Sequence, residues 1–418
     1  MEKIIINRDY YLKKLIDRQN NGLIKIVTGI RRCGKSYLLN EIFVKYLLEN
    51  GVKKDHIISV ALDNVDDDEL LNPKTLSKFI KDKIIDNEIY YVILDEIQLV
   101  DKFEFLLNGL LRIQNIDIYV TGSNSKFLSS DIITEFRGRG DEIRVYPLSF
   151  SEYYSVKKND TDINSVWKDY YTYGGLPLIA LQKSEEIKMD YLKTQSQNIY
   201  LNDIVERNNI RDKNNLNSLV NIISSAIGSL TNPKKLADTF NSKLNLSISN
   251  KTISTYLDYL ENAFLIEKSI RFDIKGKRYI DTPMKYYFTD IGIRNSLLNF
   301  RQDEETHILE NIIYIELRRR GFSVDIGVVE IREENGKRKQ IEIDFIANKG
   351  NNKFYIQSAL TVATEDKKNQ EQRPLLNVND FFKKIIIVKD SIKRKRDDNG
   401  IITMDIFDFL LDMNSLDY

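Results

Sequence analysis

Eight consecutive residues near the N-terminus have the types and the spacing that bind a chain of phosphates. They match the pattern G-x-x-x-x-G-K-S and run Gly29, Ile30, Arg31, Arg32, Cys33, Gly34, Lys35, Ser36. The two glycines let backbone N–H groups turn towards phosphate oxygens, and the following helix directs its positive dipole end to the same place. In such a loop the lysine reaches the β- and γ-phosphates and the serine hydroxyl ligates Mg²⁺. We therefore expect residues 29–37, including Tyr37, to bind ATP and Mg²⁺.

Two adjacent carboxylates stand at the end of a later apolar run. Asp95 and Glu96 directly follow residues 90–94, which read as a buried strand. Ligands of open α/β sheets bind at the carboxyl edge of the strands, so both acids should face the phosphate loop. We expect Asp95 to hold the Mg²⁺ shell and Glu96 to act as general base on the attacking water. Acids at strand ends also occur for structural reasons, and the pairing with the Gly-rich loop makes this assignment specific.

A polar turn follows the next strand-like run, residues 116–121. It contains Gly122, Ser123 and Asn124. A polar side chain at this edge of the sheet is placed to contact the γ-phosphate or the attacking water. We expect Asn124 to do so, with Ser123 as second choice. A plain Gly-Ser-Asn turn is the alternative.

Two arginines flank Gly138 in a short basic segment. An arginine near a γ-phosphate stabilises transition-state charge, often across a subunit boundary, which would require a homo-oligomer. The spacing favours Arg139 over Arg137 as such a finger, and a basic surface turn is the alternative. Cys33, inside the phosphate loop, is expected to fill space rather than to act as a redox switch.

Composition excludes several other classes of protein. The 418 residues include 62 basic and 62 acidic ones, so net charge indicates no partner. Cys33 is the single cysteine, which rules out an intrachain disulfide, and two histidines cannot build a His-rich metal site. No apolar run approaches the roughly 18 to 20 residues of a membrane span, and the N-terminus does not resemble a signal peptide. These features predict a soluble cytoplasmic protein.

Alternating strand and helix patterns in residues 1–153 must position the chemical groups. Near-continuous apolar strands separated by helices imply an α/β fold with a parallel sheet covered on both faces. Residues 154–212 have a helical pattern, interrupted by a Gly-Gly-Leu-Pro loop at 174–177. Residues 213–300 read as a small helical domain that ends in a hairpin, and residues 301–418 return to an α/β pattern. The expected strands cover residues 23–28, 56–62, 90–94, 116–121 and 142–146.

The order of these motifs resembles a known family. The chain is similar to prokaryotic AAA-type ATPases of the archaeal-ATPase group that carry a C-terminal domain of unknown function. The resemblance implies an additional-strand (ASCE) P-loop core over residues 1–153, a helical lid over 154–212, a winged-helix domain over 213–300 and a restriction-endonuclease-like fold over 301–418. The motifs are Gly29–Ser36, Leu94–Gln98, Thr121–Ser125, Gly138-Arg139, Tyr146–Tyr153 and Tyr173–Pro177.

Residues 213–300 carry 12 Lys and Arg residues against seven Asp and Glu residues, an excess of five positive charges. Lys251 and Thr252 begin an amphipathic segment that a winged helix would present to base edges. Lys275, Lys277 and Arg278 occupy the hairpin tip, where they suit phosphate contact. We expect contact with double-stranded DNA, and a protein-interaction or lid module is the alternative.

The last region resembles the PD-(D/E)xK nuclease core but departs from it where chemistry needs it. Glu310 and Glu316 on a helix, and Glu342 with Asp344 on a strand, supply acids. Gln357 stands where such nucleases have an acid, and Ala359 where they have a lysine. Gln is a weaker Mg²⁺ ligand than a carboxylate. We therefore expect a degenerate, inactive nuclease-like domain.

These features lead to a Mg-dependent ATPase that couples ATP turnover to DNA or partner binding. One alternative is a nucleotide-regulated binding module with negligible turnover, and another is an active Mg-dependent DNA nuclease. Glu96 separates the first two, because a pure switch has less need of a catalytic base.

Overall fold

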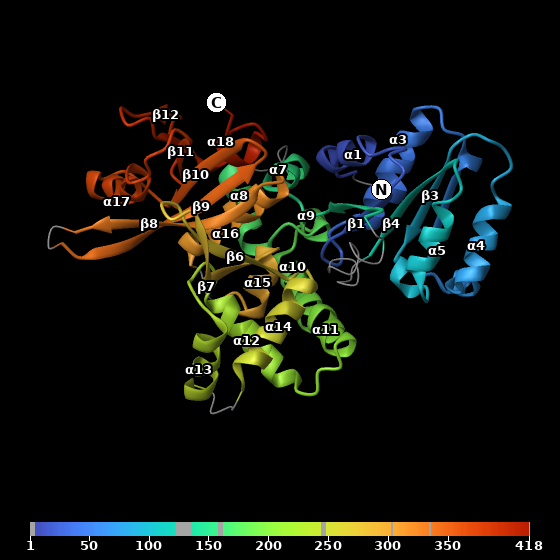
Figure 1. Cartoon of the computed structure of the whole chain (residues 1–418), viewed down its shortest axis with the longest axis horizontal. Helices are drawn as coiled ribbons and strands as arrows, with labels where there is room; N and C mark the ends of the chain where they lie inside the picture. The colour runs from blue at the N-terminus through green and yellow to red at the C-terminus, as the bar shows by residue number, and fades with distance from the viewer. Residues whose placement is uncertain are drawn as a thin grey trace. The chain divides into compact units, whose positions relative to one another are not determined.

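A computed structural model of the chain describes residues 5–122, 136, 138–157, 162–243, 248–301, 304–333 and 336–417. The chain divides into two compact units (Figure 1). The first comprises residues up to Pro147 together with Asn262–Phe264, and the second comprises the remainder from Leu148. In the described part of the chain no helix has the length and apolar character needed to cross a membrane.

The first unit is built on a five-stranded sheet in the order β2-β3-β4-β1-β5, with every neighbouring pair parallel. The phosphate loop follows β1 and the two acids end β3, and β4 lies between these strands. This is the additional-strand arrangement, so the expected α/β class and P-loop core are confirmed. The strands are β1 Ile24–Thr28, β2 Ile57–Ala61, β3 Tyr90–Asp95, β4 Ile116–Thr121 and β5 Gly140–Arg144.

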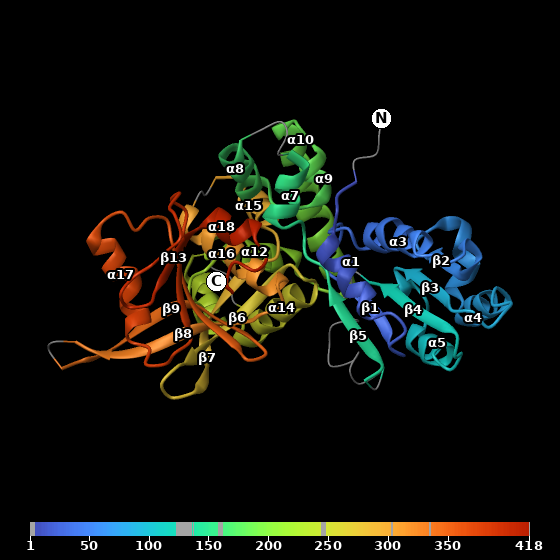
Figure 2. The same cartoon turned by 90° about the horizontal axis from the view of Figure 1, so that it is seen from above.

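Helices cover both faces of this sheet, as Figure 2 shows for α3 and α5. On one face, α4 and α5 bury apolar side chains against the strands, among them Leu76 and Leu107. On the other face, the ring of Phe43 packs against Tyr119 and Tyr91 of the strands. The helices are α1 Asp9–Ile16, α2 Lys35–Tyr37, η1 Leu38–Phe43, α3 Val44–Glu49, η2 Lys54–His56, η3 Val65–Leu71, α4 Pro73–Asp82, η4 Ile97–Leu99 and α5 Phe103–Leu110.

The second unit contains an eight-stranded mixed sheet in the order β12-β13-β11-β10-β9-β8-β6-β7. The hairpin β6–β7 joins the later strands because β6 pairs with β8 in parallel. One sheet therefore spans the point near residue 300 at which the sequence suggested a boundary. The strands are β6 Ile266–Asp273, β7 Arg278–Phe288, β8 Ser323–Arg332, β9 Arg338–Lys349, β10 Asn352–Ala359, β11 Lys383–Val388, β12 Lys395–Arg396 and β13 Ile402–Asp405.

Helices of the second unit share an aromatic cluster in which the rings of Phe150 and Trp167 contact Phe407, and Tyr170 packs against Phe150. Phe407 lies near the C-terminus, so this packing ties the last helix to the first two of the unit. The helices are α7 Phe150–Lys157, α8 Ile163–Tyr173, α9 Pro177–Leu181, α10 Glu185–Lys193, η6 Thr194–Tyr200, α11 Leu201–Arg207, α12 Lys213–Ser225, α13 Pro233–Lys243, α14 Asn250–Asn262, α15 Ile291–Leu297, α16 Glu305–Arg319, α17 Glu365–Leu376 and α18 Ile406–Leu411.

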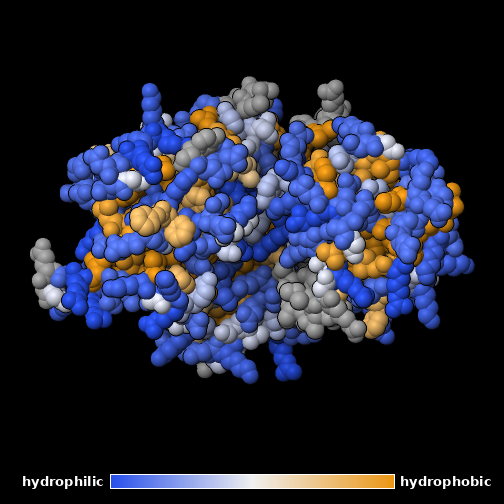
Figure 3. Space-filling model, turned by 45° about the horizontal axis from the view of Figure 1, so that its top comes forward, coloured by the Kyte–Doolittle hydropathy of each residue, from blue (hydrophilic) through white to orange (hydrophobic). Residues whose placement is uncertain are grey.

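The molecular surface seen in Figure 3 is mostly hydrophilic, with smaller hydrophobic patches. Some large apolar side chains are exposed, including Phe105 of the first unit and Phe381 of the second. Scattered apolar exposure of this kind is ordinary for folded chains.

The Gly174-Gly175 loop is a close-packing junction of the second unit. The Gly175 N–H donates to Asp290 Oδ2 at 2.7 Å, and Asp290 Oδ1 accepts from the Ile293 N–H at 3.1 Å. Burial raises the pKa of Asp290 to about 6, against the lowering effect of these N–H groups. A Cβ on Gly175 would lie 2.3 Å from the Leu148 carbonyl oxygen. Only glycine fits at this position without a shift of backbone.

We predict that Gly175→Ala lowers the free energy of unfolding by about 3 kcal/mol, because the added methyl group overlaps backbone. Trp167, the single tryptophan of the chain, reports on this unit through its fluorescence during urea unfolding. Gly109→Ala is the control, since a Cβ there meets nothing within 4 Å and should leave the Trp167 transition unchanged. Equal midpoints for Gly175→Ala and the parent chain would disprove the close packing.

Candidate functional site

The phosphate loop adopts a backbone that its two glycines make possible. Gly29 has φ 137° and Gly34 has φ 100°, both in the region that favours glycine. A Cβ on Gly29 would lie 2.1 Å from the Val145 carbonyl oxygen, so the loop packs directly against the segment after β5. The Cys33 thiol donates to the same oxygen at 3.4 Å. Cys33 is fully buried, which agrees with a packing role.

Lys35 is buried at the start of α2. Its ammonium group donates hydrogen bonds to the carbonyl oxygens of Gly29 at 3.0 Å and Ile30 at 3.2 Å. These partners are neutral, so they orient the ammonium inside the loop without cancelling its charge. An anion that enters the loop meets an oriented positive group.

Asp95 and Ser36 lie in contact, which brings the loop and the end of β3 together. The hydroxyl groups of Thr121 and Ser36 both form hydrogen bonds with the Asp95 carboxylate. Burial raises the pKa of Asp95, and the two hydroxyl groups act in the opposite direction. A carboxylate beside a hydroxyl is a pair of hard oxygen ligands, which fits Mg²⁺.

Glu96 has a left-handed backbone, with φ 54° and ψ 45°. Its N–H donates to the Thr121 hydroxyl at 2.9 Å, and its carboxylate accepts a hydrogen bond from the Gln98 side-chain amide. A non-glycine residue in this conformation needs such support. Sequence analysis assigned no role to Thr121 or Gln98, although both belong to the quoted motifs.

Arg8 is a buried arginine that the sequence analysis missed. Its guanidinium donates to the carbonyl oxygen of Cys33 at 3.0 Å and to that of Tyr146 at 2.7 Å. Tyr11 adds a third link, because its hydroxyl accepts from the Tyr146 N–H at 3.0 Å. Arg8 thus holds the phosphate loop to the chain after β5. The sequence offers little indication of this role, because Arg8 appears there only as one basic residue before an amphipathic helix.

Arg139 lies at the far end of the sheet from its own phosphate loop. Its carbonyl oxygen accepts from the Ile24 N–H at 2.9 Å, at the beginning of β1, whereas the loop follows the end of β1. Five residues of strand separate these two ends by roughly 16 Å. The exposed side chain of Arg139 donates to Asn108. If Arg139 acts as an arginine finger, it would therefore contact a nucleotide bound to another copy of the chain. Asn124, Ser123 and Arg137 lie outside the described residues.

The candidate DNA-binding residues belong to two elements of the second unit. Lys275, Lys277 and Arg278 are exposed together around the β6–β7 turn. Lys251 is exposed at the start of α14, where the Thr252 N–H donates to the Ser249 hydroxyl at 3.1 Å. This hydrogen bond caps the start of α14, so the Thr252 N–H has a structural role.

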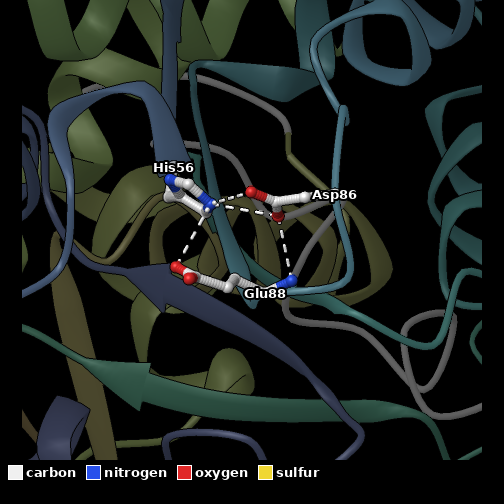
Figure 4. A group of neighbouring side chains, drawn as sticks. All are labelled: His56, Asp86 and Glu88. Carbon is white, nitrogen blue, oxygen red and sulfur yellow. Dashed lines mark hydrogen bonds and ion pairs between the residues drawn. The ribbon is translucent and has the colours of Figure 1, made fainter.

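A second group of charged side chains, which includes Asp86 and Glu88, surrounds His56 (Figure 4). His56 directly precedes β2, which runs parallel to β3, so this group lies at the opposite edge of the first sheet from Asp95. His56 Nδ1 lies 3.0 Å from Asp55, and Nε2 lies 3.1 Å from Asp86 and 3.5 Å from Glu88. The Asn115 amide donates to the carbonyl oxygens of Asp86 and Glu88, which orders their loop. The carboxylates, Asp55 first, raise the pKa of His56. A protonated His56 balances the negative charge of these carboxylates. The ligand atoms of His56, Asp86 and Glu88 are also close enough to share a metal ion.

The fold and the loop geometry define an AAA-type P-loop protein, and comparisons with known sequences agree. The family model described as an AAA domain matches residues 21–154, and a model of a domain of unknown function matches residues 164–304. An uncharacterized protein of Haemophilus influenzae is 34% identical over 98% of this chain and 100% of its own length. An uncharacterized protein of Methanocaldococcus jannaschii is 32% identical over 84% of this chain and 77% of its own length. The chain belongs to the same family as these two proteins.

Solved structures give weaker likenesses. A Walker-type ATPase of Pyrococcus abyssi has a TM-score of 0.49 at 16% identity, covering 70% of this chain and 96% of that one. The Orc1 protein of Aeropyrum pernix, solved in complex with DNA, has a TM-score of 0.30 at 11% identity, covering 71% and 93%. Scores this low assign no function to the present chain.

We predict that Arg8→Met weakens ATP binding roughly tenfold, because two charge-assisted hydrogen bonds that hold the loop are lost. Titration with a fluorescent ATP analogue in Mg²⁺ measures the effect. Arg18→Met is the matched control, since Arg18 pairs with Asp141 at 2.9 Å away from the loop. Unchanged affinity in Arg8→Met would show that the loop holds its shape without this clamp.

Proposed function

We propose that this protein is a Mg-dependent ATPase whose nucleotide site is formed by the loop at 29–36 and the acids Asp95 and Glu96. The hydrogen-bonded contact between Ser36, Asp95 and Thr121 carries the proposal, because it joins the two halves of the site. Membership in a family with an AAA domain supports the same activity.

ATP binding follows from the loop itself. Backbone N–H groups at the start of α2 face the phosphates, and the Lys35 ammonium exchanges its carbonyl partners for β- and γ-phosphate oxygens. Ser36 and Asp95 are the residues that would hold Mg²⁺, and the ion would supply positive charge against the negative charge that develops during phosphoryl transfer. The Arg8 clamp keeps the loop in position while its contacts change.

Hydrolysis requires a base near the γ-phosphate. The Glu96 carboxylate accepts a proton as water attacks the γ-phosphorus, and ADP departs from the opposite side. The Thr121 hydroxyl fixes the Glu96 backbone next to Asp95. Gln98 holds the carboxylate before nucleotide arrives, so turnover requires Glu96 to leave that partner. This contact also favours the alternative function, a nucleotide-regulated binding module with slow turnover.

We further propose that the second unit couples ATP to double-stranded DNA. The exposed basic side chains at the β6–β7 turn, with Lys251 on α14, suit phosphate contacts. In this proposal residues 154–212 act as a helical lid, residues 213–300 as a winged helix, and residues 301–418 as a nuclease-like domain without cleavage. An arginine finger at Arg139 would act across a subunit boundary and would therefore require a homo-oligomer.

For the nucleotide site we predict that Lys35→Ala abolishes ATP binding, whereas Glu96→Gln binds ATP and loses roughly 100-fold or more in turnover. The lysine contributes to binding, and the base acts in the chemical step. Binding by titration calorimetry and phosphate release under saturating ATP separate the two effects. Wild-type turnover equal to that of Glu96→Gln would favour the binding module. Intact ATP binding in Lys35→Ala would disprove the site.

For DNA coupling we predict that the triple variant Lys275→Ala/Lys277→Ala/Arg278→Ala weakens duplex binding at least tenfold at low salt. Each lost phosphate contact should reduce the slope of log binding constant against log salt concentration by about one. Fluorescence anisotropy across a salt series measures both effects. The control removes three exposed lysines of the first unit, Lys45, Lys78 and Lys81. If the wild-type chain binds no duplex at low salt, the partner is a protein instead.

A further inference from the structure

A buried lysine of the second unit stands among the acids that resemble a nuclease centre. Lys285 on β7 is 5% exposed, and its ammonium lies 2.8 Å from Glu310 on α16 and 2.6 Å from Glu342 on β9. Asp344 on β9 also acts on this ammonium through its charge. Three acids and one lysine from three elements therefore form one cluster. The lysine comes from a strand that precedes the nuclease-like region in the sequence.

The ammonium is the centre of this cluster. Burial by itself would lower the pKa of Lys285, and the Glu310 and Glu342 carboxylates outweigh it and raise the pKa. Lys285 is thus charged within an interior that would otherwise hold only carboxylates. Burying acids without a counter-ion is costly, so the ammonium is needed for these elements to pack.

Glu310 and Asp344 also contact groups other than the Lys285 ammonium. Glu310 Oε1 accepts from the Tyr287 hydroxyl at 2.7 Å as well as from Lys285, and Glu310 Oε2 lies 3.8 Å from His307. Asp344 Oδ2 accepts from both the N–H and the hydroxyl of Ser358 at 2.8 Å. Neighbouring protein groups therefore position Glu310 and Asp344 in addition to the attraction of the ammonium.

These residues do not fit the divalent cation that a nuclease-like fold implies. In the part of the chain that the structure describes, three His, Cys, Asp or Glu ligand atoms converge within 4.8 Å only at the His56 group. Around Lys285 the carboxylates are instead spread about an ammonium. Gln357, at the position of an acidic ligand, accepts from the Asp344 N–H at 3.4 Å and also hydrogen-bonds Glu371.

We propose that Lys285 is a built-in cation, whose ammonium takes the place of the divalent metal and holds β7, α16 and β9 together. The nuclease-like region is then a structural support without metal-dependent cleavage. Removing the ammonium leaves Glu310, Glu342 and Asp344 without their counter-ion and turns the cluster into a divalent-cation site. This inference is independent of the nucleotide site, so a failed ATPase assay does not affect it.

A competing view makes Lys285 the lysine that Ala359 lacks, supplied from another strand for phosphodiester cleavage. It predicts that the wild-type chain binds Mn²⁺ at Asp344 and nicks DNA, and that Lys285→Met loses both properties. Full-length protein without nucleotide, assayed for Mn²⁺ binding by calorimetry and for nicking of supercoiled DNA, decides this point. Mn²⁺ binding removed by Asp344→Asn, or nicking removed by either variant, would overturn our proposal.

The direct test is Lys285→Met, which keeps an unbranched apolar side chain and removes the charge. Thermal unfolding followed through Trp167 fluorescence in EDTA should show a midpoint lower by roughly 5–10 °C, because a buried pair is broken. Adding millimolar Mn²⁺ should recover at least about half of that loss. The wild-type midpoint should not respond to Mn²⁺.

The double variant Lys285→Met/Glu310→Gln is the matched control, since it removes one cation ligand and restores part of the charge balance. Its midpoint should not respond to Mn²⁺. A Lys285→Met midpoint equal to wild type in EDTA would overturn the proposal, because the ammonium would then not be needed. Absence of Mn²⁺ rescue in Lys285→Met, including a variant that folds in neither condition, would also overturn it.

Discussion

The position of β4 between β1 and β3 is the constraint on which the nucleotide site depends. Neighbouring strands lie about 4.8 Å apart, so one intervening strand separates the phosphate loop from the acids by about 10 Å. Thr121, at the end of β4, holds both acids in place, because its hydroxyl donates to Asp95 and accepts from the Glu96 N–H. The same strand order leaves room for Ser36 to meet Asp95. The phosphate loop, Asp95 and Glu96 are therefore positioned by one sheet edge.

The two edges of this sheet carry charge for different reasons. At the carboxyl edge, the Lys35 side chain is held by the neutral carbonyl groups of Gly29 and Ile30. At the amino edge, charges cancel one another: Lys25 pairs with Asp117 in the interior, and His56 is surrounded by carboxylates. Uncompensated charge is costly to bury, so a fold retains it where a ligand completes the balance. The carboxyl edge therefore has a cation held only by neutral groups, whereas the charged side chains at the amino edge are paired with one another.

The second unit shows how a sheet can join segments that look like separate domains. The hairpin β6–β7 has the length and basic tip of a wing, yet β6 also pairs with β8. Lys285 on that hairpin then reaches the acids of α16 and β9. The hairpin therefore presents basic residues at its turn and contributes a buried counter-ion at its other end. The two roles fit one hairpin because β7 is largely exposed near its turn and buried over its last five residues, which include Lys285.

Local pattern was enough to predict the parallel α/β core, the phosphate loop and the acids after β3. Strand periodicity, glycine spacing and the strand–loop–helix context are short-range signals, and the observed strands lie within about two residues of the expected ones. Tertiary structure alone decided the roles of Arg8, Thr121 and Lys285, and the distance of Arg139 from its own loop. Each depends on which strands pair and in which order, and that choice is made by long-range burial rather than by neighbouring residues. Lys285 illustrates the limit: it stands far from Glu310 and Glu342 in the sequence, and only the fold brings its ammonium to within 2.8 Å of the first carboxylate and 2.6 Å of the second.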